Sequence, residues 1–131
     1  MNALLVARCL ACAFFGVLFL QSGFDKLFDW KGNLGWLTGH FEKSPLKNMV
    51  PLMLGTMTLV EISAGLCSVG GLIVLLVNGP AWVPILGIGL SGLALTMLFA
   101  GQRIAKDYEG AATLATYFGA ALLSLLLMVG L

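Results

Sequence analysis

The sequence contains few charged residues. Only 10% of its 131 residues are Lys, Arg, Asp or Glu, whereas 60% are hydrophobic. Soluble domains carry about 25% charged residues, so the composition excludes an ordinary soluble fold and predicts an all-α membrane protein. The net charge is +1 and the basic residues are not clustered, which excludes DNA or RNA as a partner.

Histidine and cysteine are also scarce. His40 is the only histidine, so one chain cannot supply two axial imidazoles to a haem. The three cysteines lie in apolar runs, without the spacing of metal ligands. We expect no haem, no metal and no covalently bound cofactor. Phosphate-binding loops and nucleophile elbows are absent as well, which favours a non-catalytic subunit over a self-sufficient enzyme.

Four long apolar runs make up most of the chain. Each has about 20 residues or more, enough to cross about 30 Å of hydrocarbon as an α-helix. We expect spans at residues 3–23, 49–77, 82–100 and 111–131. No signal-peptide cleavage site follows the first run, which is therefore expected to remain as a span. Residues 1–131 are predicted to form one domain, a four-transmembrane-helix bundle in contact with membrane lipids.

The longer polar connection, residues 24–48, contains apolar residues at helical spacing together with Trp30 and Trp36. This pattern is typical of an interfacial segment that lies on the membrane surface between the first two spans. Its three glycines are expected to break it into short turns: Gly32, Gly35 and Gly39.

The basic residues indicate how the chain is oriented. Six of the seven Lys and Arg lie in the two polar connections, residues 24–48 and 101–110. The positive-inside rule predicts that both connections are cytoplasmic and that both termini lie outside.

Glu61 is the only charged residue in the second span, about 16 Å from its start at 1.5 Å per residue. An acid in a membrane segment costs roughly 2.5–3.5 kcal/mol and is a functional candidate. Arg8 enters from the opposite side, and one hypothesis is a buried Arg8–Glu61 pair. The alternative has Arg8 extending to the headgroups and Glu61 protonated and hydrogen-bonded to a neighbouring helix.

Cys9 and Cys12 have C-x-x-C spacing, which places their sulfur atoms one helical turn apart, and Cys67 is expected at a similar depth. A thiol-exchange site is one hypothesis. Packing is favoured, because apolar surroundings disfavour the reactive thiolate.

Polar side chains follow the first and third spans on the predicted cytoplasmic side. If residues 101–110 are helical, Arg103, Lys106 and Asp107 share a face, available to an anion, a lipid headgroup or a quinone carbonyl. Ordinary anchoring at the interface is the alternative. This cytoplasmic rim comprises Gln21, Asp25, Lys26, Gln102, Arg103, Lys106, Asp107 and Tyr108.

Three short segments and one arginine resemble the DoxX family of small four-helix membrane proteins. They are FLQSGFDK at residues 19–26, EISAG at 61–65, GQRIAKDYEGAA from residue 101, and Arg8 in the first span. The resemblance implies a bacterial-type inner-membrane protein. Some family members are associated with quinone-linked oxidation of reduced sulfur, and others with oxidoreductase complexes that handle thiol stress. The matching positions of interest are Arg8, Lys26, Glu61 and Arg103.

Three functions follow as hypotheses. The first is an accessory or quinone-interacting subunit of a membrane oxidoreductase or respiratory complex, with other membrane subunits or a second copy as partners. The second is an oligomeric small-solute or proton-coupled transporter that uses Glu61. The third is a structural scaffold without chemistry of its own.

Overall fold

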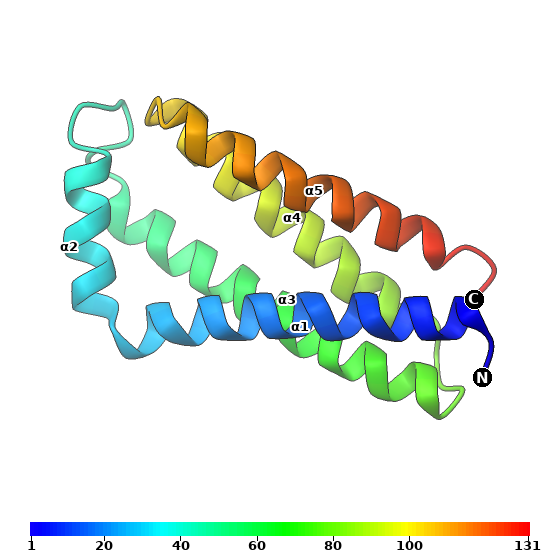
Figure 1. Ribbon diagram of the computed structural model, residues 1–131. Helices are drawn as coiled ribbons and strands as arrows, with labels where there is room; N and C mark the ends of the chain where they lie inside the picture. The colour runs from blue at the N-terminus through cyan, green and yellow to red at the C-terminus, as the bar shows by residue number, and fades with distance from the viewer.

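The computed structural model of residues 1–131 is entirely helical (Figure 1). Four of its five helices are long and apolar enough to cross a membrane. The helices are α1 Ala3–Phe28, α2 Trp30–His40, α3 Val50–Leu76, α4 Trp82–Ile104 and α5 Tyr108–Leu127. The predicted all-α fold with four candidate spans is therefore confirmed.

Helix boundaries differ from the prediction in the polar connections. α1 continues to Phe28, past the predicted end of the span at Gly23, because Gly23 packs tightly against Ile62 of α3 instead of ending the helix. α2 is one continuous helix of 11 residues, so the prediction that its glycines break it into turns was wrong. A glycine inside a helix costs only about 1 kcal/mol, which is a weak preference. The Asn33 side chain also ties α2 to α1 by donating to Asp25 O and Asp29 O.

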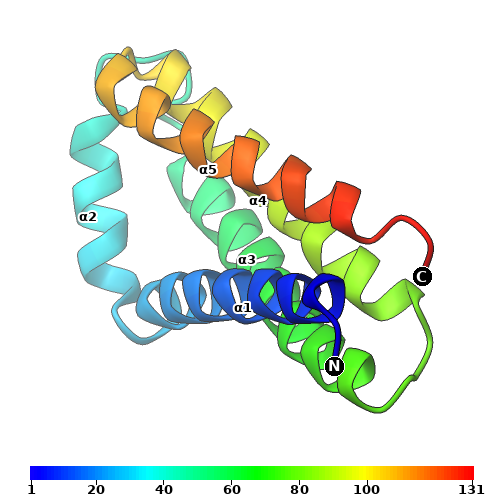
Figure 2. The ribbon, with the colours of Figure 1, turned by 45° about the vertical axis from the view of Figure 1, so that its right-hand side comes forward.

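α3 lies at the centre of the bundle, with α1 packed along one side and α4 along the other. α5 packs mainly on α4 (Figures 1 and 2). α1 and α5 are close near the chain termini and diverge toward the other end, where α2 turns sharply away from α1 (Figure 1). α2 thus lies across this end of the bundle.

The two ends of the bundle differ in composition. Both termini and the turn at Asn78 lie at one end, the terminal end, whereas α2 and the α4–α5 connection lie at the other, the α2 end (Figure 1). Asn78 adopts a left-handed backbone conformation with φ 55°, which asparagine tolerates in tight turns. This arrangement gathers six of the seven basic residues at the α2 end.

Small residues set the distance between the helices. A Cβ atom on Gly65 would lie 2.8 Å from the Leu20 backbone nitrogen, and one on Gly87 would lie 2.7 Å from the Ser68 nitrogen. Only glycine permits backbones to approach this closely, as is common in membrane helix pairs. The crossings bring α1 and α4 onto opposite sides of α3.

The outer surface of the bundle is apolar. Leu10, Leu59 and Leu123 are each 65–69% exposed, and similar side chains surround all four long helices. A soluble protein rarely exposes so large an apolar area, whereas lipid tails accommodate it. The chain is therefore a multi-pass membrane protein whose surface contacts lipid.

Candidate functional site

Glu61 is completely buried, and Lys26 compensates its charge. Lys26 Nζ lies 3.0 Å from Glu61 Oε1, and the Lys26 side chain is 17% exposed. The same ammonium donates a hydrogen bond to Ser22 Oγ at 2.8 Å. No other group donates to either Glu61 oxygen, so Lys26 is the only partner of this buried carboxylate.

The hypothesis of an Arg8–Glu61 pair was wrong. Arg8 Nε donates to Leu127 O at 2.6 Å, and its Nη2 donates to Val129 O at 2.8 Å. These carbonyls lie at and just after the C-terminal end of α5, where helix carbonyls lack internal donors. Arg8 neither reaches Glu61 nor extends freely to the headgroups. The hydrogen bonds proposed for a protonated Glu61 are absent too.

The structure predicts a local role for Arg8. Arg8→Met should lower the free energy of unfolding by about 1–3 kcal/mol, because it removes two hydrogen bonds from a charged donor at a partly exposed site. Amide hydrogen exchange should accelerate in residues 124–131 and remain unchanged elsewhere. Lys43→Met is the matched control, since the exposed Lys43 makes no hydrogen bond and no ion pair. Equal exchange in the two variants would contradict this role.

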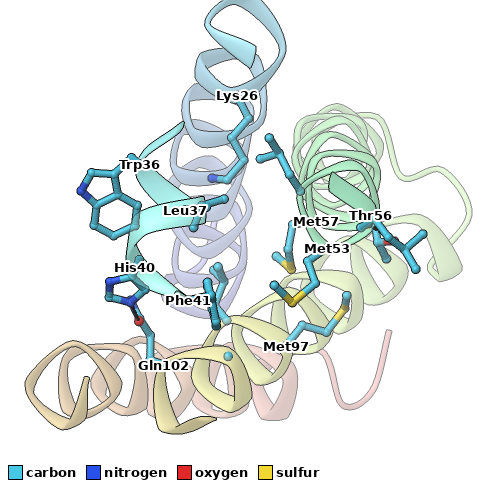
Figure 3. Close-up of a pocket in the computed structure, with 14 residues that line it drawn as sticks. Lys26, Trp36, Leu37, His40, Phe41, Met53, Thr56, Met57, Met97 and Gln102 are labelled. Atoms are coloured by element: carbon cyan, nitrogen blue, oxygen red, sulfur yellow. Dashed lines mark hydrogen bonds between the residues drawn. The ribbon is translucent and has the colours of Figure 1, made fainter. Parts of the chain in front are cut away.

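A cavity of about 290 Å³ lies at the α2 end, between the end of α1 and helices α2, α3 and α4 (Figure 3). We name it the Lys26–His40 pocket. Three flexible methionine side chains, Met53, Met57 and Met97, form part of its wall, and such side chains adapt to ligands of irregular shape. The Lys26 ammonium points toward the pocket from α1 (Figure 3). The remaining lining residues are Trp36, Leu37, His40, Phe41, Leu52, Leu54, Thr56, Leu98, Gly101 and Gln102.

Polar groups on α2 and α4 meet at another side of this pocket (Figure 3). His40 Nε2 and Gln102 Oε1 are 2.7 Å apart, which joins α2 to α4. The Trp36 ring stacks on the His40 imidazole with centroids 4.6 Å apart and an interplanar angle of 16°. Asp107 Oδ2 lies 3.8 Å from His40 Nε2. Because the Gln102 oxygen can only accept, Nε2 carries the hydrogen in this contact.

The predicted shared face of Arg103, Lys106 and Asp107 does not form. α4 ends at Ile104 and Lys106 has a left-handed φ of 62°, so the segment is not one helix. The Arg103 guanidinium lies 4.7 Å from the centroid of the Tyr108 ring. Asp107 caps α5 by accepting from Gly110 N at 3.0 Å. These side chains stabilise the α4–α5 connection and do not line the pocket.

The other rim residues lie in three different places. Gln102 joins Lys26 in the pocket, and Asp25 is exposed. Gln21 lines a separate apolar groove between α1 and α5.

The three thiols do not form a site with the pocket. Cys9, Cys12 and Cys67 are free; Cys12 is completely buried in the core, and none of them lines the pocket. No group of three or more His, Cys, Asp or Glu side chains is arranged to hold a metal ion.

Comparisons with protein-family models, curated proteins and solved structures find no match for this chain. The resemblance to the DoxX family stays a prediction from its motifs.

Two signals in the sequence could have located the pocket. Trp36 and His40 are four residues apart and share one face of α2, and Met57 and Glu61 are related in the same way on α3. Trp36 was interpreted only as an interfacial anchor. Ser22, which holds the Lys26 ammonium, carried no comparable signal.

Proposed function

We propose that this chain is a quinone-binding accessory subunit of a membrane oxidoreductase, with the quinone ring in the Lys26–His40 pocket. One observation carries the proposal: a mainly apolar pocket has the Lys26 ammonium at one side and the His40–Gln102 pair at another. A quinone is a flat apolar ring with a carbonyl acceptor on each of two sides. Apolar walls with a few placed polar groups are typical of small-molecule sites.

The charge of the pocket favours a neutral ligand. Glu61 compensates the Lys26 ammonium, so no unpaired cation is available to a fatty acid or a phosphate. An anion would add a charge to a low-dielectric site, at a cost that a neutral quinone avoids.

The pocket also offers a route for an isoprenoid tail. Leu52 is 65% exposed and, with the exposed Thr56, lines the wall formed by α3. Both residues are on the lipid-facing surface, so a tail can leave the pocket sideways into the bilayer while the ring stays inside.

Electron transfer requires a partner, because a quinone is reduced or oxidised only with a second redox group. We assign that group to another subunit and a non-catalytic, quinone-holding role to this chain. The resemblance to the DoxX family supports this role, and the positive-inside rule supports a cytoplasmic α2 end in a bacterial-type inner membrane.

Binding of decylubiquinone to the purified protein in detergent micelles tests the proposal. Quinones quench tryptophan fluorescence at short range, and Trp36 lines the pocket. We expect saturable quenching that Trp36→Phe reduces and Trp82→Phe retains, since Trp82 begins α4 at the terminal end.

A pair of matched substitutions adds specificity to this test. Gln102→Leu removes the His40 partner and should weaken binding at least fivefold, whereas Gln21→Leu in the α1–α5 groove should leave binding unchanged. Absence of saturable quenching, or equal loss in both variants, would refute the quinone site.

A further inference from the structure

We propose that a second copy of this chain packs against α1 in the membrane, with the Gln21 amides of the two copies hydrogen-bonded to each other. The inference does not depend on the quinone site. It starts from one side chain. Gln21 is exposed in the first span, lines the groove between α1 and α5, and has no hydrogen-bond partner for its amide.

The other exposed polar side chains within the spans are satisfied by their own helix. Thr56 on α3 and Thr96 on α4 each donate to the carbonyl four residues earlier, at 2.8 and 2.9 Å. Thr113 and Thr116 on α5 do the same. A hydroxyl bonded in this way tolerates contact with lipid, whereas an amide without a partner is costly to place in hydrocarbon. Gln21 therefore needs a partner from outside the bundle.

Gln21 belongs to an apolar stripe on the face of α1 opposite the residues buried against the other helices. The stripe residues follow one another at intervals of four and three positions, which is the spacing of a coiled-coil seam. Phe24 and Phe28 continue the stripe beyond Gln21, so exposed apolar side chains flank the amide on both sides. We name these residues the α1 stripe: Leu10, Phe14, Val17, Gln21, Phe24 and Phe28.

A similar stripe on α3 has no unsatisfied amide. Leu52, Leu59 and Leu66 are exposed at intervals of seven positions. The polar side chains between them, Thr56 and Ser63, donate to carbonyls of their own helix. Lipid tails alone satisfy such a surface. Heptad spacing therefore does not distinguish the α1 stripe, and Gln21 does.

A second copy offers the group that Gln21 lacks. Copies inserted with the same orientation are related by a two-fold axis along the membrane normal, so α1 meets its copy in parallel and Gln21 meets its own equivalent at the same depth. A carboxamide carries both donors and an acceptor, so the two amides satisfy each other reciprocally. A lipid tail has neither. The groove between α1 and α5, of about 880 Å³, gives room to the stripe side chains of the second copy.

Sedimentation equilibrium of the full chain in density-matched detergent micelles tests this interface. We expect a reversible dimer. Gln21→Leu should raise its dissociation constant about three- to tenfold, the usual effect of one hydrogen bond between membrane helices. Gln21→Asn keeps an amide and should raise the constant less. Thr96→Leu is the matched control, because it removes an exposed polar side chain from α4 and should leave the dimer unchanged.

Cysteine cross-linking in liposomes locates the contact. In a variant whose three native cysteines are replaced by alanine, Val17→Cys should form an intermolecular disulfide on oxidation, whereas Leu59→Cys on α3 should not. A monomer at every concentration, equal dissociation constants for Gln21→Leu and Thr96→Leu, or cross-linking at position 59 without position 17 would overturn the inference. Each of these outcomes leaves the quinone site intact, since Gln21 does not line the Lys26–His40 pocket.

Discussion

Replacing Lys26 with methionine is expected to lower the free energy of unfolding at pH 7 by about 3–5 kcal/mol. Removing one partner of a buried ion pair leaves the other charge without compensation, and Glu61 is completely buried with no partner other than Lys26. Chemical unfolding in detergent micelles, followed by circular dichroism, measures the loss. Lys31→Met is the matched control, because Lys31 is exposed on α2 and its replacement should change stability by less than about 0.5 kcal/mol.

A double replacement distinguishes the effect of the lost charge pair on stability from the effect of altered side-chain packing. Lys26→Met combined with Glu61→Met removes both charges and should restore most of the lost stability, as apolar replacement of buried pairs often does. Equal stability of Lys26→Met and Lys31→Met would show that Glu61 is already neutral in the native protein, and it would contradict the ion pair.

The four candidate membrane spans could be predicted because they depend on local properties of the chain. Apolar runs of about 20 residues define spans, and the alternation of spans places the two polar connections at the same end of the bundle. Glu61 could also be recognised as a candidate site residue, since the charge of a single acid in an apolar run needs a partner or a proton whichever helix it faces. These signals need no knowledge of how the helices pack.

The partners of the charged residues could not be predicted in the same way. Arg8 binds carbonyls of residues 127 and 129, more than 100 positions away, and the choice between them and Glu61 depends on where α5 ends. Lys26 was assigned to the polar connection that follows the first apolar run, yet α1 continues past it, with Gly23 packed against α3. The pocket forms only because α2 lies across the end of the bundle. The hydrophobic pattern of the sequence predicts a helix but does not specify where that helix packs.

Two glycines in α4, Gly87 and Gly89, are expected to respond differently to replacement by alanine: the first variant should lose stability and the second should not. A Cβ atom on Gly87 would lie 2.7 Å from the Ser68 nitrogen and 2.8 Å from the Cys67 carbonyl carbon. Both are backbone atoms that cannot rotate away, so Gly87→Ala must push α3 and α4 apart. We expect a loss of about 2–3 kcal/mol, at the upper end of the usual cost of overpacking.

Gly89→Ala is the matched control, because no atom lies within 4 Å of the Cβ position at Gly89. Alanine favours a helix over glycine by up to about 1 kcal/mol, so this variant should be as stable as the native protein or slightly more so. Thermal unfolding in one detergent compares the two. A similar loss of stability in both variants would show that glycine is needed for the backbone of α4 itself and not for the close contact between α3 and α4. Because Met57 and Met97 reach the pocket from these two helices, the Gly87 variant should also bind decylubiquinone more weakly, whereas the Gly89 variant should bind it normally.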